Sequence, residues 1–297
     1  MFNLFQIKNN NPNIMLHSLL LLLFSFYLFT PKMSYALDDY EKMKCKKKLA
    51  SFDASLANLP LNELMVEVGK TFMGTPYVAG TLDENPEREE LVVNITGLDC
   101  VTFVENCLVM SRLIKQNKTD FESYLKELEM IRYRAGINAG YSSRLHYFSD
   151  WIYDNEAKGI VRNISSEIGG VPYDKPINFM SGHRGSYKQL SSDQNLAGIE
   201  EVENMINQRQ TYFVPEDLIS SVYGKLQTGD IVGITSTLDG LDIAHTGLVY
   251  KDDSGTYLLH ASLKNKEVEI SKSEIQQYIE ANSKQDGIMV ARVVEMK

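Results

Sequence analysis

The protein has 297 residues, 43% of them hydrophobic, which is enough chain to bury one large core or two small ones. Its 30 Lys and Arg residues are outnumbered by 39 Asp and Glu residues, so the formal net charge is −9 at pH 7. An acidic surface repels phosphate backbones and anionic lipids, which argues against a protein that binds nucleic acid or a membrane surface.

The first 36 residues have the pattern of a secretory signal peptide. Lys8 precedes a short apolar run, Leu19–Thr30, and Ser34-Tyr35-Ala36 is a small-x-small cleavage site. The run is shorter than the roughly 20 residues that span a bilayer. We therefore expect residues 1–36 to be removed without leaving a membrane anchor, and the mature protein to be periplasmic or secreted. A single domain is expected over residues 37–297.

The chain after the signal is expected to be mostly helical at first. Residues 38–57 are charged and predict a solvated helix or arm, and residues 59–72 predict an amphipathic helix. A loop over residues 75–83 contains Tyr77, and residues 91–95 predict a short strand.

A helix is predicted to begin at Cys100. From there, apolar residues recur every three or four positions through Ile114, whereas polar residues such as Glu105 gather on the opposite side. Asp99 is a favoured helix N-cap residue. A thiol in the first turn lies at the positive end of the helix dipole, so we expect the pKa of Cys100 to fall from about 8.5 toward about 7. Cys107, in the middle of the helix, is interpreted as a core residue.

Three cysteines in an exported chain cannot all pair with one another. Either Cys45 and Cys107 form a disulfide and leave Cys100 as the odd thiol, or none of the three is bridged. The first arrangement is the one that a cysteine nucleophile needs.

The middle of the chain predicts one more helix, over residues 121–134, followed by loops over residues 136–190. The loops are rich in aromatic residues, glycine and proline. Long irregular segments in compact proteins are usually functional loops or disordered segments, and the aromatic content argues against disorder. We expect inserted substrate loops here.

The last third of the chain changes character, to short β-branched strands separated by turns. The predicted strands cover residues 230–235, 243–250, 256–262, 268–271 and 289–294. Helices first and strands later predict an α+β fold, in which helices pack on an antiparallel sheet.

Two of these strands carry a histidine among apolar residues, His245 and His260. If Lys251 pairs with Ser254 around a two-residue turn, the histidines fall directly opposite each other, with Cβ atoms roughly 5 Å apart. A register shifted by one residue would place them on opposite faces of the sheet.

A thiol, an imidazole and a second group that orients the imidazole form the nucleophile, base and orienter scheme. Cys100 would attack a carbonyl, and His245, oriented by His260, would take its proton and pass it to the leaving amine. The Cys100 backbone N–H and the Tyr77 hydroxyl would hold the oxyanion. Taken singly, either histidine could instead be a satisfied core residue.

A metal site is the other chemistry that the histidines allow. His146, His183, His245 and His260 are all potential ligands, but the sequence contains no HExxH or CxxC spacing. We therefore expect no metal and no other cofactor.

These motifs resemble those of a known family. Tyr77, Leu98-Asp99-Cys100, His245 and His260 occur in the order found in NlpC-type papain-like cysteine hydrolases of bacterial cell walls. Longer stretches are similar to the N-acetylmuramoyl-L-alanine amidase-like family within that group. They are Tyr77 to Leu82, Asp99 to Glu105, Arg144 to Trp151, Met180 to Arg184, Gly229 to Ile231 and Leu259 to Ser262.

The resemblance implies a papain-like fold and hydrolysis, without metal, of the amide between the lactyl group of muramic acid and L-alanine. Peptidoglycan fragments with an anhydro sugar are the expected substrates. The wider group often has serine after the nucleophile, where aspartate and serine help to hold a free L-alanine amine. This chain has Asp99 but Val101 there. An acylated L-alanine has no ammonium to hold, so the change favours an amidase.

The resemblance also directs attention to polar residues of the predicted loops. Arg144, His146, His183 and Arg184 are expected, together with Asp99, to contact substrate. Arg144 could pair with a substrate carboxylate, and Tyr147 or Trp151 could stack on a sugar. Alternatively, these loop residues pack the two loops together.

Two other functions stay open at this point. One is a muropeptide endopeptidase that cuts between D-glutamate and diaminopimelate, and the other is a cell-wall binding module without activity. The complete set of Cys100, His245 and His260 argues against the inert module. The sequence does not indicate an oligomeric state.

Overall fold

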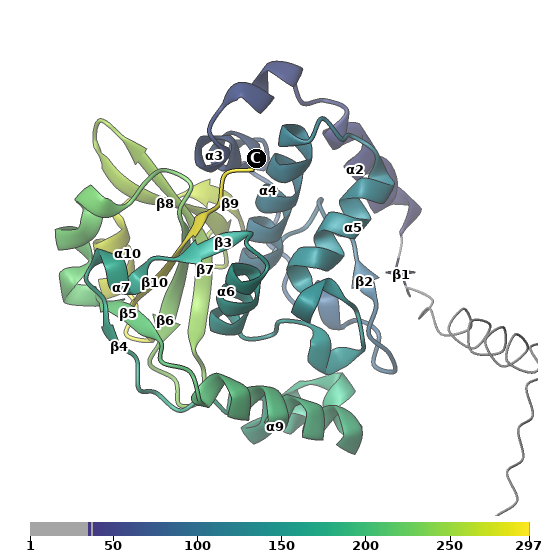
Figure 1. The fold of residues 1–297 in the computed structure, drawn as a ribbon, viewed down its shortest axis with the longest axis vertical. Helices are drawn as coiled ribbons and strands as arrows, with labels where there is room; N and C mark the ends of the chain where they lie inside the picture. Colours follow the sequence, from purple (N-terminus) through teal and green to yellow (C-terminus); the bar gives the residue numbers. More distant parts are fainter. Residues whose placement is uncertain (1–34, 37, 297) are drawn as a thin grey trace, which may run out of the picture. The chain divides into compact units, whose positions relative to one another are not determined.

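The computed structural model describes residues 35–36 and 38–296, and helix α4, Cys100–Lys115, lies at its centre (Figure 1). Asp99 Oδ1 accepts the Thr102 backbone N–H at 2.8 Å, and Thr102 Oγ1 accepts the Asp99 N–H at 2.9 Å. This reciprocal pair is a capping box, which satisfies backbone donors that the first turn would leave unpaired. The predicted helix start at Cys100 is therefore confirmed.

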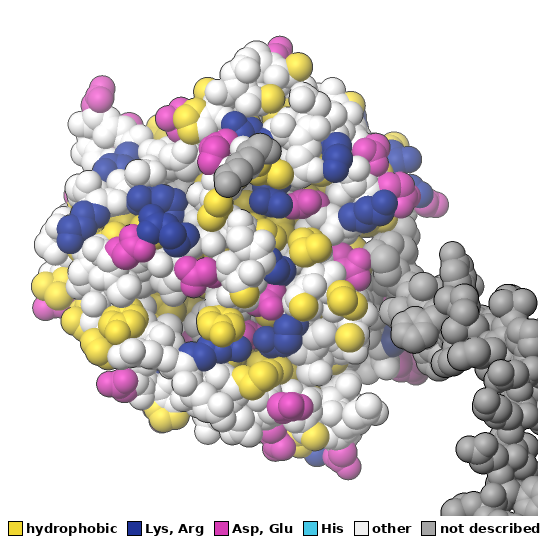
Figure 2. Space-filling model, viewed as in Figure 1, with side chains coloured by type: hydrophobic (Ala, Val, Ile, Leu, Met, Phe, Trp, Pro, Cys, Tyr) yellow, Lys and Arg dark blue, Asp and Glu magenta, His cyan; other side chains and the backbone are white. Residues whose placement is uncertain are grey.

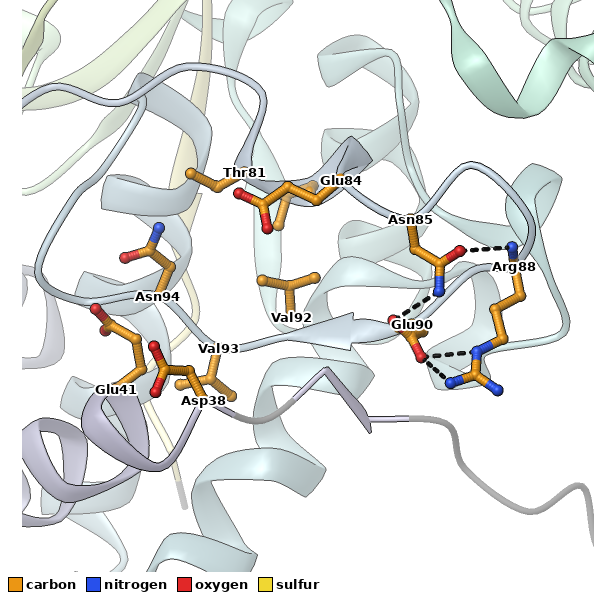
Figure 3. Close-up of a pocket in the computed structure, with 11 residues that line it drawn as sticks. Asp38, Glu41, Thr81, Glu84, Asn85, Arg88, Glu90, Val92, Val93 and Asn94 are labelled. Atoms are coloured by element: carbon orange, nitrogen blue, oxygen red, sulfur yellow. Dashed lines mark hydrogen bonds and ion pairs between the residues drawn. The ribbon is translucent and has the colours of Figure 1, made fainter.

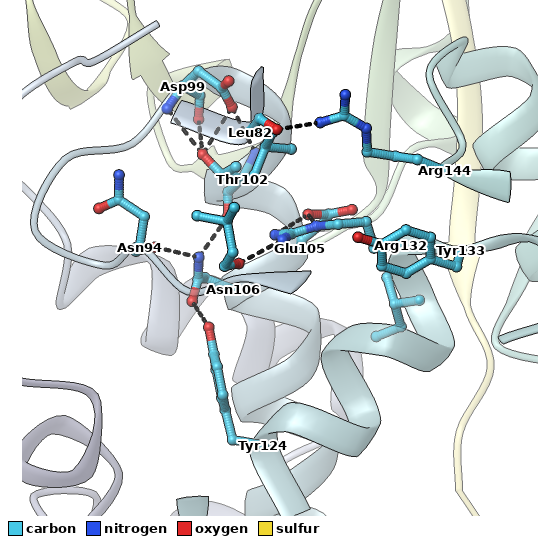
Figure 4. Close-up of polar contacts among 12 residues, drawn as sticks. Leu82, Asn94, Asp99, Thr102, Glu105, Asn106, Tyr124, Arg132, Tyr133 and Arg144 are labelled. Carbon is cyan, nitrogen blue, oxygen red and sulfur yellow. Dashed lines mark hydrogen bonds and ion pairs between the residues drawn. The ribbon is translucent and has the colours of Figure 1, made fainter. Parts of the chain in front are cut away.

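Burial of α4 extends beyond the apolar face that was predicted, to the polar residues on its opposite side. Glu105 and Asn106 are each 1% exposed, because helix α5 (Phe121–Arg132) covers them. Glu105 forms an ion pair with Arg132 at 2.7 Å, and Asn106 Oδ1 accepts the Tyr124 hydroxyl at 2.7 Å (Figure 4). Buried polar groups need partners of this kind, and here they join α4 to α5.

The C-terminal strands form an antiparallel sheet in the order β4-β5-β10-β6-β7-β8-β9, and β3 also pairs with β10. The strands are β3 (Val161–Asn163), β4 (Val171–Pro172), β5 (Tyr212–Pro215), β6 (Ile231–Ser236), β7 (Ile243–Asp252), β8 (Gly255–Ser262), β9 (Glu267–Ile270) and β10 (Gln285–Val293). A separate parallel pair joins β1 (Tyr35–Ala36) to β2 (Leu91–Val92). The five strands predicted in the last third are all present, within a few residues of their expected bounds.

Both faces of the sheet are covered by helices (Figure 1). Alternate residues point to opposite faces, so Leu248 and Leu259 join the core with α4, whereas Val249 and Leu258 join a second core with α10. The first core is built with α3 (Leu61–Lys70), α4, α5 and α6 (Phe148–Ala157), and the second with α7 (Ser165–Ile168), the 3-10 helix Glu216–Lys225 and α10 (Ile275–Glu280). The predicted α+β arrangement of helices on an antiparallel sheet is confirmed.

The region predicted as loops, residues 136–190, is more ordered than expected. It contains α6, β3, α7, β4 and a short helix, α8 (Phe179–Gly182). Phe148, Trp151 and Ile152 lie at positions i, i+3 and i+4 of α6, and all three are buried. The two aromatic side chains therefore belong to the buried face of this helix. Helix α9 (Asp193–Asn207), which follows, was not predicted.

A further helix lies at the N-terminal end of the domain. Helix α2 (Asp39–Leu49) follows Asp38, which caps it, and buries Cys45 and Leu49. Among the described residues, no helix is both long and apolar enough to cross a membrane. Of the predicted signal peptide, residues 1–36, only Tyr35 and Ala36 are among the described residues. On the face shown in Figure 2, acidic and basic side chains are interspersed, with apolar side chains scattered between them.

Arg132→Met should destabilise the protein by about 3–5 kcal/mol, because the Glu105 carboxylate would stay buried without its partner. The double variant Glu105→Leu/Arg132→Met should recover most of that loss. Lys70→Met, which breaks the exposed ion pair of Lys70 with Glu67, is the control and should change stability by less than about 0.5 kcal/mol. Urea denaturation followed by circular dichroism measures all three; equal effects of Arg132→Met and Lys70→Met would contradict the prediction.

Candidate active site

The histidine hairpin has a register two residues away from the predicted one. Asp252, not Lys251, closes the turn by pairing with Gly255, and His260 lies opposite Gly247. Because the shift is even, both histidines still point to the same face of the sheet. His245 and His260 are therefore diagonal neighbours, not direct partners.

The two imidazoles are hydrogen-bonded to each other. His245 Nε2 lies 2.7 Å from His260 Nδ1, and the rings are nearly perpendicular, at 86°. If His245 donates from Nε2, its Nδ1 keeps a lone pair and can act as a base, and His260 must then carry its proton on Nε2. Glu269, the cross-strand partner of His260 on β9, has Oε1 3.8 Å from that nitrogen. Its carboxylate favours this tautomer.

Cys100 is half-buried and lies beside β7 at the position next to His245. The backbone N–H groups of Thr246, Cys100 and Val101 lie near enough to the Cys100 sulfur to favour its anion. Tyr278 of α10 also connects the groups: its ring centroid is 5.2 Å from that of His260 and 6.3 Å from that of His245. The structure thus gathers the three residues of the predicted triad around one end of α4.

Burial changes the acid–base properties of this cluster, contrary to the prediction for the thiol. Burial, and then the Asp99 carboxylate, raise the pKa of Cys100 to about 12, although the three backbone N–H groups act in the opposite direction. Burial lowers the pKa of His245 to about 3, with His260 adding to the effect, and lowers the pKa of His260 to about 4. The predicted lowering of the thiol pKa is wrong, and at neutral pH the thiol and both imidazoles are uncharged.

Tyr77 is held beside the start of α4 by backbone contacts. Its backbone N–H donates to the Lys266 carbonyl at 2.8 Å. Tyr77 also forms a β-bridge with Leu98, two residues before Cys100. Burial raises the pKa of Tyr77, and Cys100 and Asp99 raise it further. The phenol therefore keeps its proton at neutral pH and is available as a hydrogen-bond donor.

Asp99 and Arg144 have partners within the protein. Asp99 Oδ1 is occupied by the helix cap. Arg144 is only 4% exposed, and its guanidinium contacts Asp83, Glu89 and the Leu82 carbonyl, to which Nη1 donates at 2.9 Å (Figure 4). The hypothesis that Arg144 pairs with a substrate carboxylate is therefore corrected: this arginine pairs with the buried Glu89 and the partly exposed Asp83, and it fixes the loop after Tyr77.

The other loop candidates pack within their own region. The ring of His146 lies on Tyr141 and shares a hydrogen bond with its carbonyl at 2.8 Å, and the exposed His183 stacks on Phe179. Arg184 donates to the Leu190 carbonyl at 2.6 Å. Each of these contacts lies within one loop and does not join the two loops, so substrate contact by His146, His183 and Arg184 stays a prediction.

The two aromatic residues proposed to stack on a sugar are inside the protein. Trp151 is 0% exposed and stacks on Phe148, and the Tyr147 hydroxyl donates to Glu203 at 2.7 Å. Neither ring has a face open to a ligand, so this hypothesis is wrong.

The cysteines answer one of the open alternatives. All three cysteines are free, and Cys45 and Cys107 are both buried, so the Cys45–Cys107 disulfide is not formed in the structure. Within the described part of the chain, no group of three His, Cys, Asp or Glu side chains is suited to hold a metal ion.

Sequence reasoning missed Tyr278 and Glu269. Tyr278 lies on a six-residue helix more than thirty positions after His245, and no local pattern links the two. Glu269 could have been found from the β8–β9 pairing, because an alternating strand after a short turn places it opposite His260.

One cavity of the domain lies among acidic residues of its N-terminal part, and another lies beside His245. One, of about 540 Å³, is lined by Asp38, Glu41, Glu84 and Glu90, with the Arg88 side chain beside Glu90 (Figure 3). The other, of about 470 Å³, is lined by His245 and Tyr278 and opens between the β6–β7 loop, the β8–β9 turn and α10. The second cavity adjoins the histidines.

The comparisons with known proteins agree with this fold. A family model described as N-acetylmuramoyl-L-alanine amidase-like matches residues 67–288, so the chain belongs to that family. Membership indicates a hydrolase of the amidase type that acts on peptidoglycan. Among curated proteins, none matches the sequence significantly.

Solved structures extend the similarity. An N-acetylmuramoyl-L-alanine amidase from Bacteroides uniformis is 33% identical, with a TM-score of 0.75 over 79% of this chain and 99% of that one. A protein from Bacteroides fragilis provisionally named a xylanase is 32% identical, with a TM-score of 0.69 over 76% of this chain and 99% of that one. A Legionella pneumophila protein, 19% identical, shares the fold with a TM-score of 0.63 over 88% of this chain and 97% of that one.

Asp99→Asn should make Cys100 more reactive. Asparagine keeps an oxygen that can accept the Thr102 N–H but removes the charge that raises the pKa of the thiol. The rate of Cys100 alkylation by iodoacetamide at a fixed pH near 8 should rise by up to about tenfold, since one pKa unit changes the thiolate fraction tenfold. Peptide mass mapping identifies the alkylated residue. Asp99→Ala, which also removes the cap, is the comparison, and an unchanged rate in Asp99→Asn would contradict the expectation.

The protein should lose stability as the pH falls from about 6.5 to about 4. In this range the unfolded chain protonates both imidazoles, whereas the folded pair, with its lowered pKa values, stays neutral. The double variant His245→Gln/His260→Gln should show a shallower fall in its urea midpoint over the same range. If wild type and variant lose stability in parallel, the two histidines are not the cause.

Proposed function

We propose that the protein is an exported, papain-like cysteine amidase that hydrolyses the N-acetylmuramoyl-L-alanine amide bond of peptidoglycan fragments. The observation that supports the proposal is the hydrogen-bonded pair of His245 and His260, together with the backbone of Thr246, next to His245, near the Cys100 sulfur. Membership of the amidase-like family supplies the substrate class. The pattern of residues 1–36 supports export to the periplasm or beyond the cell.

In the first step, the Cys100 sulfur attacks the lactyl carbonyl carbon while His245 Nδ1 takes the thiol proton. Both groups are uncharged at rest, so proton transfer accompanies the attack and does not precede it. The positive charge that forms on His245 is stabilised through its Nε2–H by His260. Glu269, 3.8 Å beyond His260, adds its negative charge to that stabilisation.

The carbonyl oxygen becomes negative in the tetrahedral intermediate. The Cys100 backbone N–H at the start of α4 and the Tyr77 hydroxyl are the donors for it, and one such donor contributes about 10²- to 10³-fold in rate. His245 then donates its proton to the L-alanine nitrogen, the C–N bond breaks, and the peptide leaves with a free amine. The lactyl group stays on Cys100 as a thioester.

Water completes the reaction. His245 takes a proton from a water molecule, whose oxygen attacks the thioester carbonyl, and the thiol leaves with the proton returned by His245. The products are muramic acid with a free carboxyl group and a free peptide. A fragment with an anhydro sugar is the proposed substrate.

The endopeptidase alternative requires a site for a free L-alanine ammonium. Asp99 is the residue that could supply a charge, but one of its carboxylate oxygens is occupied by the α4 cap, and Val101 follows Cys100 where a serine would help. These observations favour the amidase over the endopeptidase. An inert binding module would not need the aligned imidazole pair.

The decisive experiment incubates the mature protein with an anhydromuramyl tripeptide and identifies products by mass spectrometry. Wild type should release the intact tripeptide with a free L-alanine amine, and Cys100→Ala should be inactive because it lacks the nucleophile. Cys107→Ala, which changes a buried cysteine of the same helix, is the control and should retain activity.

Other products would decide against the proposal. A dipeptide left on the sugar would establish the endopeptidase instead. Substrate that is bound but never cut would establish a binding module, and equal activity of Cys100→Ala and wild type would remove the cysteine from the mechanism.

A further inference from the structure

The cavity beside His245 has an apolar wall that is open to solvent. Its volume is about 470 Å³. Leu238 and Leu241 of the β6–β7 loop line one part of it, and Leu263 of the β8–β9 turn lines another. Leu238 is 39% exposed and Leu263 is 55% exposed. Large apolar side chains that face a hollow of this size offer contact area to an extended ligand.

The rim of the cavity is positively charged. Lys264 of the β8–β9 turn and Lys284, just before β10, both line it and are exposed, and neither forms an ion pair with a residue that the structure describes. The described lining includes no Asp or Glu. On a chain with a net charge of −9, two unpaired lysines over one groove create a local attraction for anions.

One buried group in the cavity lacks a partner. Gln285, the first residue of β10, is 6% exposed, and its Oε1 accepts no hydrogen bond from any described residue. Buried amide oxygens are nearly always paired in folded proteins. Gln285 also lines the cavity, so its side-chain amide is near any ligand bound there.

The position of His245 decides which half of the substrate lies here. In an amide hydrolysis the base returns its proton to the leaving nitrogen, so the leaving group must lie against His245. His245 forms part of the cavity wall, together with Tyr278. The leaving group of the proposed reaction is the peptide, which carries amide N–H groups and free carboxylates, whereas the sugar remains on Cys100.

We propose that this groove, lined by Leu238, Leu263, Lys264, Lys284 and Gln285, binds the acidic peptide of the substrate on the leaving-group side of Cys100. The inference rests on the proposed amidase function. Peptide carboxylates pair with the two lysines, a peptide N–H donates to Gln285, and aliphatic parts of the peptide lie on the leucines. The other cavity, with Asp38, Glu41, Glu84 and Glu90 in its wall, repels the same ligand.

The test measures binding of an anhydromuramyl tripeptide to Cys100→Ala protein by isothermal titration calorimetry, so that no turnover occurs. Adding Lys264→Ala or Lys284→Ala should weaken binding by about twofold to fivefold each, the range for an exposed charge pair. The same tripeptide with its carboxyl groups amidated should bind the lysine variants and the parent equally. Raising the salt concentration should weaken binding of the acidic ligand only.

Lys272→Ala is the matched control, because Lys272 is an exposed lysine just after β9 that does not line the groove. It should bind as the parent does. Gln285→Leu should weaken binding of the acidic and the amidated ligand alike, since both keep the backbone N–H groups. A thermal melt of each variant checks that the fold is intact.

The outcomes separate this inference from the proposed function. If the lysine variants bind the acidic tripeptide as tightly as the parent while wild type still cuts it, the groove inference is wrong and the amidase stands. If wild type cuts nothing but the lysine variants lose the charge-dependent binding, the groove stands and the amidase is wrong. An equal loss for the acidic and the amidated ligand in the lysine variants would also overturn the charge pairing.

Discussion

The contact between the two imidazoles is the constraint on which the site depends. It requires His260 to face a residue without a side chain, because a Cβ on Gly247 would lie 2.9 Å from the Cβ of His260 and 2.9 Å from the Leu259 carbonyl. With glycine there, the ring of His245 reaches diagonally to His260 at 2.7 Å. The hairpin register therefore sets the orientation of His245, and through the adjacent Thr246 it also sets the position of the thiol.

Two physical effects compete at Cys100, and burial is the stronger. A helix start favours a negative charge by about 0.3–1 kcal/mol, which is less than one pKa unit. Burial removes the thiolate from water, and the Asp99 carboxylate repels it. Together they raise the pKa of Cys100 by more than the helix start lowers it. Burial thus holds the thiol protonated, and the capping residue Asp99 adds to the effect, so nucleophile activation falls to His245.

Local patterns predicted much of the architecture, because helix periodicity, the Asp99 cap and the β-branched strands depend only on residues that are close in the sequence. The fold class, the start of α4 and the histidine-bearing strands followed from them. The hairpin register did not, since a turn at Lys251 and one at Asp252 suit the sequence equally. Nor did the partners of Arg144, because Asp83 and Glu89 lie 55 to 61 positions upstream. Contacts that are distant in sequence decide whether a polar side chain faces ligand or protein.

The place of β10 in the sheet bears on how the chain reaches its folded state. This strand lies between β6 on one side and β3 and β5 on the other, yet it follows every other strand in the sequence. The two cores on either side of the sheet both contain β10 residues, so neither can close until that strand has emerged from the ribosome. Closure of both cores thus waits for the last strand, which suits the proposed export, because a translocation pore accepts an unfolded chain.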